Sequence, residues 1–477
     1  MRSGLDFRAA RARLRRAEER REGRSEQVSR RIRGRKRQKA KREAVMAEGE
    51  GRTWLAAQSA TRATEIAARL EGASSAELRA ELDRLILWNR RIHDEDCVNL
   101  DPAANVMHPR AEAALAQGLG SRPSLGHAGA KYETGLEAIE EIEEIARNLA
   151  MEIFGARFAE IRAPSGALAN LMSFMACAKA GDRVITPPAA IGGHVTHQTP
   201  GAAGLYGLEV HNSAPDRSGA YTVDLELLRE QALRLRPKLI SIGGSLNFTP
   251  HPVAEIRSIA DEVGAKLLFD AAHLSGPIAG GVWPNPLKEG AHLLTMSCYK
   301  SLGGPPSGLI LTNEPDLAQR LDAIAFPGLT ANSDPGKAAA LAYALLDWRA
   351  PNGPAYARAM VETAQALEAA LRAEGLPVYG ETRSHQLALE AKDWGGGGAM
   401  AQRLRKANLL ACAIGLPIPE GDGLRLGTSE MVRRGLTPQE APELARLIGR
   451  ALYEAPESVA AEVSAFRRRF TGFRFVS

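Results

Sequence analysis

The sequence predicts an α/β fold with a large, mainly parallel sheet covered by helices on both faces, and a smaller C-terminal α/β domain. Three observations indicate this fold. Between residues 159 and 312, short apolar segments of strand length alternate with longer amphipathic segments of helical period. The connections are long enough for the crossovers that parallel strands need. Beyond residue 335 a long helical segment leads into a second set of shorter strands and helices.

Two amphipathic helices are expected within residues 52–92, where apolar residues recur three and four positions apart. Ser74 and Ser75 stand where a side chain would cap the second helix. We assign residues 51–110 to this N-terminal helical segment, which could wrap a neighbouring domain or subunit.

The large domain is assigned to residues 111–335, and its first long helix is predicted from Glu137 to Gly155. Predicted strands follow at residues 159–164, 182–188, 207–212, 238–244, 266–272, 292–297 and 308–312. Helices between them are predicted at residues 165–180, 224–235 and 253–264. Folds of this kind bind ligands at the carboxyl ends of the strands.

The small domain is assigned to residues 336–477. Its helices are predicted at residues 338–348, 356–375, 399–408 and 442–454, and its strands at 376–380, 386–391 and 423–428. Four consecutive glycines, 395–398, are interpreted as a connector, because no Lys-Ser/Thr pair follows them as in a phosphate-binding loop.

Positive charge is concentrated at the N-terminus. Residues 1–43 hold 18 of the 61 Lys and Arg residues and 6 of the 56 Asp and Glu residues, which leaves 43 basic and 50 acidic residues elsewhere. We interpret residues 1–50 as a basic, disordered extension, or as sequence upstream of a start near Met46. The six acidic residues argue against a mitochondrial presequence, which should be poor in acidic residues. Binding of RNA by this basic extension is the alternative interpretation.

The chain is expected to be a cytoplasmic protein without a membrane segment. It contains no run of about 18 apolar residues, and its first residues lack the apolar core of a secretory signal. The four cysteines are widely spaced and form no C-x-x-C pair, so neither a zinc site nor a disulfide framework is indicated.

Two residues that follow neighbouring predicted strands suggest a cofactor. Asp270 ends one strand, and Lys300 follows the next strand 30 residues later. Pyridoxal phosphate (PLP) needs a lysine for a Schiff base and an anion that keeps its pyridine nitrogen protonated. Its phosphate needs N–H groups at a helix N-terminus, which the three residues Ser165, Gly166 and Ala167 provide. Each feature alone also fits a cap or a surface lysine, but their combination favours a PLP site.

The segments FDAAHLSGPIAGGVWPNP and TMSCYKSLGGPPSGLILT resemble the serine hydroxymethyltransferase family of fold-type I PLP enzymes. The similarity extends from about Asn105 to Tyr453 and includes APSGALANLMSF, GGHVTHQTPG and GLRLGTSEMVRRG. It implies a PLP-dependent enzyme of amino-acid and one-carbon metabolism that forms a homodimer or tetramer with active sites at the subunit interface.

The resemblance also implies roles for individual residues. Lys300 would form the Schiff base, Asp270 would pair with the pyridine nitrogen, and His273 would lie beside the cofactor oxygen and the substrate. Arg425 would bind the substrate carboxylate, a role that suits the fork of a guanidinium group. Three further residues lie in or near these motifs. We assign cofactor binding to His194 and Ser297, and catalysis to Tyr299.

Several positions depart from the family pattern. The family's Tyr-x-Glu, whose glutamate transfers protons with folate and the substrate hydroxyl, falls at Pro123 and Leu125. Ile191 stands in place of the histidine that stacks on the ring, Tyr299 in place of the histidine before the lysine, and Pro306 in place of an arginine. His127, His194 and Glu133 are kept as candidate acid/base groups.

These departures leave the reaction open. Retro-aldol cleavage of a β-hydroxy amino acid needs the cofactor and one base for the hydroxyl proton, whereas folate-dependent transfer needs a folate pocket and a proton donor as well. A folate-independent aldolase for a 3-hydroxy or α-branched amino acid is therefore as well supported as serine–glycine interconversion, with tetrahydrofolate an open question. Transamination, racemisation or decarboxylation by the same fold is the alternative.

Overall fold

The computed structural model describes residues 54–218, 221–419 and 421–477. The expectation for the basic extension, residues 1–50, lies outside the described residues. The chain forms two compact units, of which the first ends at Glu95 and the second runs from Asp96 to Ser477. Among the described residues, no helix is both long enough and apolar enough to cross a membrane.

The first unit contains the two helices expected there, α2 (Ala57–Leu70) and α3 (Ser75–Arg90). Ser74 caps α3, because its hydroxyl accepts from the Glu77 backbone N–H while the Glu77 carboxylate accepts from the Ser74 N–H. Arg69 of α2 donates to Glu81 of α3 at 2.7 Å, which joins the two helices.

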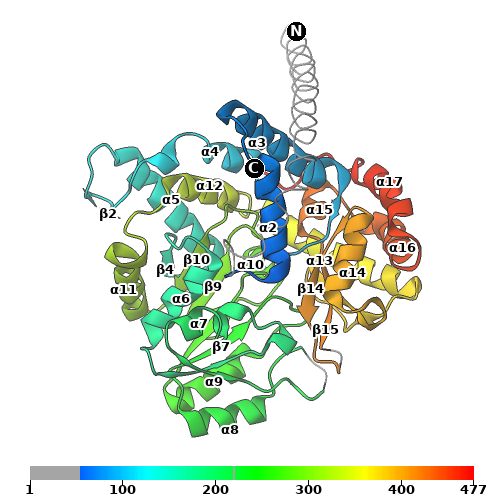
Figure 1. The fold of residues 1–477 in the computed structure, drawn as a ribbon. Coiled ribbons are helices and arrows are strands. Elements are labelled where there is room, and N and C mark those ends of the chain that lie inside the picture. The colour runs from blue at the N-terminus through cyan, green and yellow to red at the C-terminus, as the bar shows by residue number, and fades with distance from the viewer. Residues whose placement is uncertain (1–53, 219–220, 420) are drawn as a thin grey trace. The chain divides into compact units, whose positions relative to one another are not determined.

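The second unit is built around a seven-stranded sheet (Figure 1). Its strands are β4 (Phe158–Glu160), β5 (Arg183–Thr186), β6 (Glu209–Asn212), β7 (Leu239–Gly243), β8 (Lys266–Asp270), β9 (Leu293–Ser297) and β10 (Gly308–Thr312). Their order is β4-β10-β9-β8-β7-β5-β6, and only β10 runs antiparallel to its neighbours. The prediction of a mainly parallel sheet is confirmed.

Helices cover both faces of this sheet, because successive strand residues point to opposite faces and both are apolar. In β8, Leu267 and Phe269 belong to one buried cluster, and Leu268 belongs to another. The first face is covered by α5 (Glu137–Phe154), α8 (Leu225–Leu235), α9 (Val253–Val263), α10 (Ser275–Ala279) and α12 (Pro335–Leu346). The second face is covered by α6 (Gly166–Cys177), α7 (Ala202–Leu205) and α11 (Pro315–Ala323).

A four-stranded antiparallel sheet forms the C-terminal part, in the order β11-β12-β15-β14. These strands are β11 (Val378–Tyr379), β12 (Gln386–Glu390), β14 (Cys412–Gly415) and β15 (Asp422–Gly427). Its helices are α13 (Asn352–Ala373), α14 (Gly397–Lys406), α15 (Ser429–Arg434), α16 (Ala441–Tyr453) and α17 (Pro456–Arg467). The smaller C-terminal α/β domain is thus present as predicted, while the domain boundaries at residues 110 and 335 stay a prediction.

Short elements complete the second unit. Strand β1 (Val98–Asn99) pairs with β13 (Leu409–Leu410), which places Val98 and Leu100 in the C-terminal core. Further short elements include helix α4 (Pro109–Ala114) and the hairpin of β2 (Gly126–His127) and β3 (Ala130–Lys131).

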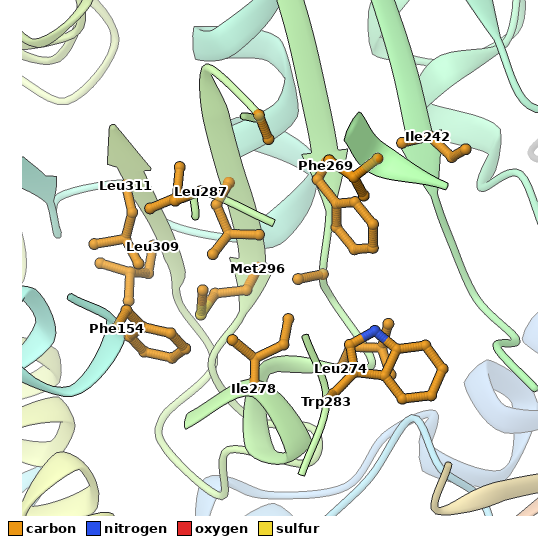
Figure 2. Close-up of a cluster of buried hydrophobic side chains, with 14 of the residues drawn as sticks. Phe154, Ile242, Phe269, Leu274, Ile278, Trp283, Leu287, Met296, Leu309 and Leu311 are labelled. Atoms are coloured by element: carbon orange, nitrogen blue, oxygen red, sulfur yellow. The ribbon is translucent and has the colours of Figure 1, made fainter. Parts of the chain in front are cut away.

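The core under the first face of the large sheet is closely packed at the end of α5 (Figure 2). Phe154, the last residue of α5, is 1% exposed and belongs to the same cluster as Leu309 and Leu311 of β10. We expect Phe154→Ala to destabilise the protein by about 3–5 kcal/mol, since the substitution leaves a cavity in a packed core. Equilibrium urea unfolding would show a lower midpoint for Phe154→Ala.

Glu152→Ala is the matched control for this prediction. Glu152 lies two residues before Phe154 on α5 and makes an exposed ion pair with Arg349, at 3.0 Å, whose loss should cost less than about 1 kcal/mol. Equal midpoint shifts for the two variants would contradict the assignment of Phe154 to the core.

Candidate active site

The candidate site lies where β8 and β9 end at their carboxyl ends. Asp270 is the last residue of β8 and pairs in register with Thr295 of β9, whose last residue is Ser297. His273 follows Asp270 by three residues, and Lys300 follows Ser297 by three. Because the two strands are parallel neighbours, the residues that follow them are brought to one edge of the sheet.

Asp270 is buried and fully hydrogen-bonded. Its Oδ2 accepts from His197 Nε2 and from Asn170 Nδ2, both at 2.9 Å, and its Oδ1 accepts from the backbone N–H of Ala272 at 2.9 Å. Burial by itself would raise the pKa of Asp270, but the hydrogen bonds from His197, Asn170 and Ala272 outweigh it and lower the pKa below its usual value. The carboxylate is therefore a permanent anion.

Two residues that the sequence analysis missed hold this carboxylate. His197 lies in the loop after β5, and its Nδ1 is 3.0 Å from Ser241 Oγ on β7. Asn170 is on α6, and its Oδ1 accepts from Thr295 Oγ1 at 2.7 Å. Neither residue was singled out, although both lie within quoted motifs, His197 in GGHVTHQTPG and Asn170 in APSGALANLMSF.

Lys300 is buried, and its Nζ is 3.0 Å from His273 Nε2. Burial lowers the pKa of Lys300 to about 8, with the Asp270 charge acting in the opposite direction and the Arg425 charge acting with burial. The ring of Tyr299, which precedes the lysine, has its centroid 5.9 Å from the Lys300 Nζ. The structure thus places Tyr299 beside the amine.

His273 is buried between two cationic side chains. Its Nε2 is 3.0 Å from Lys300 Nζ and 3.3 Å from Arg425 Nη1. Burial first, and then the charges of Lys300 and Arg425, lower the pKa of His273 well below its ordinary value, so the imidazole is neutral. The hydroxyl of Ser301 donates to the His273 carbonyl at 2.7 Å and fixes the loop.

Arg425 reaches this cluster from β15 of the C-terminal sheet. Its guanidinium donates to the carbonyl of Ser245 and to Cys412 Sγ, the latter at 3.0 Å, and it lies 4.0 Å from Asp101 Oδ1. Asp101 and Cys412 were not predicted, because they become neighbours of Arg425 only in the folded chain. The arginine predicted to bind a carboxylate is therefore brought to Lys300 and His273.

The predicted phosphate site lies at the start of α6. Ser165 caps this helix, since its hydroxyl accepts from the Leu168 N–H at 3.2 Å. A Cβ at Gly166 would collide with Ser297 Oγ, so only glycine lets the helix start so close to the end of β9. Ser165, Gly166, Ala167 and Ser297 are therefore adjacent, next to the helix end that favours anions.

His194 is half-buried in the same region. Its Nδ1 is 3.0 Å from Thr196 Oγ1, and that hydroxyl also accepts from Asn170 Nδ2 at 3.0 Å. Burial lowers the pKa of His194, so its imidazole is neutral at neutral pH and can accept a proton.

The arrangement fits a pyridine ring with an aldehyde and a phosphate. A buried amine with a lowered pKa, Lys300, is available to react with the aldehyde, and a buried anion, Asp270, is available for a protonated ring nitrogen. The start of α6 offers backbone N–H groups for the phosphate. In the described part of the chain, no group of side chains is arranged to hold a metal ion.

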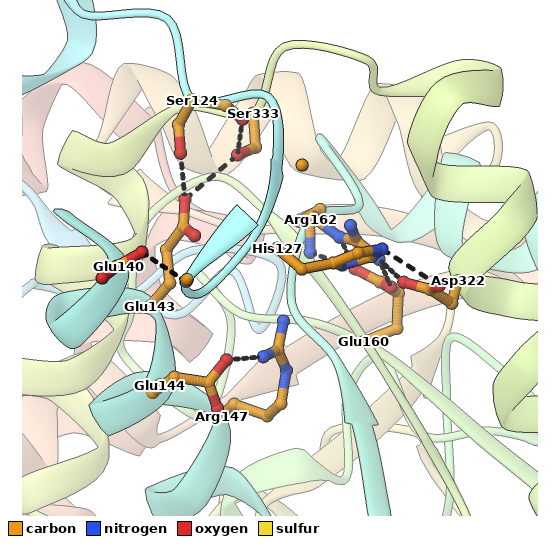
Figure 3. A network of polar contacts seen from close by, with 12 residues as sticks. Ser124, His127, Glu140, Glu143, Glu144, Arg147, Glu160, Arg162, Asp322 and Ser333 are labelled. Carbon is orange, nitrogen blue, oxygen red and sulfur yellow. Dashed lines mark hydrogen bonds and ion pairs between the residues drawn. The ribbon is translucent and has the colours of Figure 1, made fainter. Parts of the chain in front are cut away.

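His127 and Glu133 are not brought into this cluster within the described residues. His127 is half exposed in the β2–β3 hairpin, 3.6 Å from Asp322 and edge-on to Phe326 (Figure 3). Glu133, just after β3, has a buried carboxylate oxygen without a partner among the described residues. In this chain, the expectation that both are acid/base groups near Lys300 finds no support in their contacts.

A second polar network holds this hairpin segment to α5 (Figure 3). Glu143 of α5 accepts from Ser124 Oγ at 2.6 Å and pairs with the buried amine of Lys131, and Ser333 lies 3.4 Å from the same carboxylate. Ser124 stands between Pro123 and Leu125, so this network fixes the segment that departs from the family pattern.

We predict that Lys300 reacts with the PLP aldehyde at a rate that rises through a pH of about 8. The neutral amine is the nucleophile, and burial destabilises the ammonium form, so the amine appears well below the ordinary pKa of 10.5. Stopped-flow absorbance after mixing cofactor-free protein with PLP at several pH values measures this rate. Lys300→Arg gives the background signal without the reacting amine. A rate that reaches half of its maximum only near pH 10.5 would contradict a buried amine with a lowered pKa.

Comparison with known proteins agrees with this geometry. A family model described as serine hydroxymethyltransferase matches residues 81–448. An α-methylserine aldolase of Variovorax paradoxus is 58% identical over 433 residues, which cover 89% of this chain and 98% of that protein. An α-methylserine aldolase of a Ralstonia species is 52% identical over 421 residues, which cover 86% of this chain and 96% of that protein.

More distant relatives carry the family's own name. The serine hydroxymethyltransferase of Sulfolobus acidocaldarius is 35% identical over 410 residues, which cover 83% of this chain and 94% of that protein. The matched region includes the ends of β8 and β9, the start of α6 and the strand that carries Arg425. The chain belongs to the serine hydroxymethyltransferase family, as a divergent member.

Proposed function

We propose that the protein is a PLP-dependent, folate-independent aldolase that breaks the Cα–Cβ bond of an α-branched β-hydroxy amino acid of the α-methylserine type. One observation carries the choice of aldolase over transferase. Where the family pattern has its proton-transferring Tyr-x-Glu, this chain has Pro123 and Leu125, neither of which can exchange a proton. The identity with α-methylserine aldolases supports the choice of substrate.

The cofactor assignment follows from the cluster at the strand ends. When bound, PLP supplies an electron sink for the pair of electrons that remains on Cα after the bond breaks. Lys300 would attach the cofactor and Asp270 would hold the pyridine nitrogen. The phosphate would lie against the segment formed by Ser165, Gly166 and Ala167, with Ser297 beside it.

The substrate assignment rests on Arg425. A guanidinium forms two parallel hydrogen bonds with a carboxylate, and Arg425 is fixed within reach of His273 and Lys300. We therefore assign the amino-acid carboxylate to Arg425, which orients the substrate with its Cα toward the lysine side of the site.

The reaction then needs a base for the hydroxyl proton. As the Cα–Cβ bond breaks, the hydroxyl loses its proton, an aldehyde leaves, and Cα later takes up one proton. For α-methylserine the products are formaldehyde and alanine, and all atoms are accounted for. His194 is neutral because burial lowers its pKa, so it can accept the proton at neutral pH. His273 and Tyr299 flank the amine as further catalytic groups.

Assembly and location are part of the proposal. We infer a homodimer or tetramer with active sites at the interface, because the segment with Leu125 and His127 has no contact with Lys300 among the described residues. A cytoplasmic location is supported by the four cysteines, all of which are free.

Folate-dependent hydroxymethyl transfer is the second candidate. The relatives at 35% identity are named serine hydroxymethyltransferase, and the residues assigned to PLP do not distinguish the two reactions. Whether cleavage requires added tetrahydrofolate therefore distinguishes the aldolase from the transferase.

The substrate test uses purified protein saturated with PLP. We expect formaldehyde from α-methylserine at a rate that is unchanged by tetrahydrofolate, and release from serine slower by at least about 10-fold, equivalent to about 1.4 kcal/mol in the barrier. Lys300→Ala should abolish release. Cleavage of serine that requires added tetrahydrofolate would establish the transferase instead. Conversion of a 2-oxo acid to an amino acid, with no aldehyde formed, would contradict both candidate functions.

The carboxylate assignment predicts a selective effect of Arg425→Lys. Loss of one arm of the fork should raise KM for α-methylserine about 10- to 100-fold, the equivalent of about 1.5–3 kcal/mol for a charged hydrogen bond. The dissociation constant of PLP should stay within about 3-fold, since Arg425 is not assigned to the cofactor. Arg446→Lys, at an exposed position of α16, is the control. An unchanged KM in Arg425→Lys would remove the arginine from the substrate site.

A further inference from the structure

Gln386 reaches the site from the C-terminal sheet, and no motif singled it out. It is the first residue of β12 and is fully buried. Its Nε2 donates to the carbonyl of Ser245 at 2.9 Å, and its Oε1 accepts from the backbone N–H of Asn247 at 3.2 Å. A carbonyl can only accept and a backbone N–H can only donate, so these two bonds fix which end of the amide is nitrogen.

The second hydrogen on Gln386 Nε2 is directed at His273. The distance from Nε2 to His273 Nδ1 is 3.3 Å, and the other Nε2 hydrogen is taken by Ser245. A neutral imidazole has one N–H and one acceptor nitrogen. If Nδ1 accepts from Gln386, the proton of His273 must be on Nε2, the nitrogen that faces Lys300 at 3.0 Å.

We propose that Gln386 is a positioning residue that holds His273 in the tautomer with its proton on Nε2, so that the imidazole presents an N–H to Lys300 and to the reacting groups. The tautomer of a histidine is set by the hydrogen bond that its other nitrogen makes. With its hydrogen on Nε2, His273 donates a hydrogen bond toward Lys300 and the reacting groups and so orients the proton transfers there, and Gln386 keeps that hydrogen on the correct side of the ring.

The opposite side of the ring competes with Gln386. An ammonium on Lys300 would donate to Nε2 and so favour the other tautomer, as would Arg425 Nη1 at 3.3 Å. One Nη1 hydrogen of Arg425 is donated to the Ser245 carbonyl, and the other faces His273 Nε2, so Arg425 is the donor against which the Gln386 bond competes. Burial lowers the pKa of Lys300 to about 8, so above that pH its amine is neutral and is the acceptor that an Nε2–H requires.

The Gln386 amide is itself held in place by a chain of buried hydrogen bonds. The hydroxyl of Ser384 donates to the Asn247 carbonyl, and Asn247 Nδ2 donates to the Gly244 carbonyl at 3.1 Å. Asn247 Oδ1 lies 3.1 Å from Nε2 of His251, whose Nδ1 is 2.9 Å from Thr222 Oγ1. The donor directed at His273 is therefore preorganised and cannot turn without breaking bonds to backbone groups.

The test is the protonation of the two ring nitrogens, read by 15N NMR. Protein labelled with 15N-histidine and saturated with PLP contains ten histidines, and His273→Asn identifies the resonances of His273. We expect wild type to show a protonated Nε2 and an unprotonated Nδ1. Gln386→Met keeps the length of the side chain but has no N–H, and at least half of the His273 population should then move its proton to Nδ1.

Gln365→Met is the matched control. Gln365 is on α13, and its amide donates to the Thr382 carbonyl at 3.3 Å, away from His273. It should leave both His273 resonances unchanged. A wild-type His273 with its proton on Nδ1 would overturn the proposal, and so would a Gln386→Met protein that keeps the proton fully on Nε2. If Gln386→Met does not fold, the wild-type spectrum alone decides.

This inference rests on the proposed function in one respect, because it assumes that His273 takes part in the reaction at this site. The tautomer of His273 is measured without substrate. The role of Gln386 can therefore be refuted in a protein that is an active aldolase, and it can be upheld in a protein that cleaves no β-hydroxy amino acid. As a second readout, the KM of Gln386→Met for α-methylserine should change less than about 3-fold while kcat falls about 10-fold, since proton transfer and not carboxylate binding is affected.

Discussion

The burial of one carboxylate, Asp270, is the constraint on which the rest of the site depends. A buried anion is tolerated only when donors surround it. The donors to Asp270 come from α6, from the loop after β5 and from the backbone after β8, as Asn170, His197 and Ala272. Satisfying the carboxylate therefore draws three segments of the chain to one edge of the sheet, and the start of α6 comes with them.

Gly243 lets the neighbouring loop join this edge. It has a positive φ of 85°, and a Cβ there would collide with the carbonyl of Asp270. The loop that follows carries Ser245, whose carbonyl accepts from both Arg425 and Gln386. Arg425 and Gln386 of the C-terminal sheet are thus both fixed against the large sheet by one carbonyl of the loop after β7.

Much of the fold and part of the site could be predicted from the sequence, because both depend on local patterns. Short apolar strands and their spacing predicted the parallel sheet, and the position of Asp270 and Lys300 after adjacent strands predicted that both lie at one edge of that sheet. Strand β14 (Cys412–Gly415) was missed, since CAIG is too short and too weakly apolar to stand out. Asn170 could not be found, because it lies 100 residues from the carboxylate it contacts. Gln386 was missed for the same reason, at 113 residues from His273.

The charges of the cluster explain why a base is available without the family's glutamate. Asp270 is an anion held by donors, and Arg425 brings a guanidinium cation next to Lys300 and His273. Lys300 and His273 lie next to this fixed cation, which acts with burial to disfavour a second and third positive charge beside it. His273 is therefore neutral at neutral pH, and Lys300 loses its proton near pH 8, well below its ordinary pKa of 10.5. Burial also keeps the half-buried imidazole of His194 neutral, and we propose that it accepts the hydroxyl proton, so that aldol cleavage does not require the carboxylate that the family pattern has at the position of Leu125.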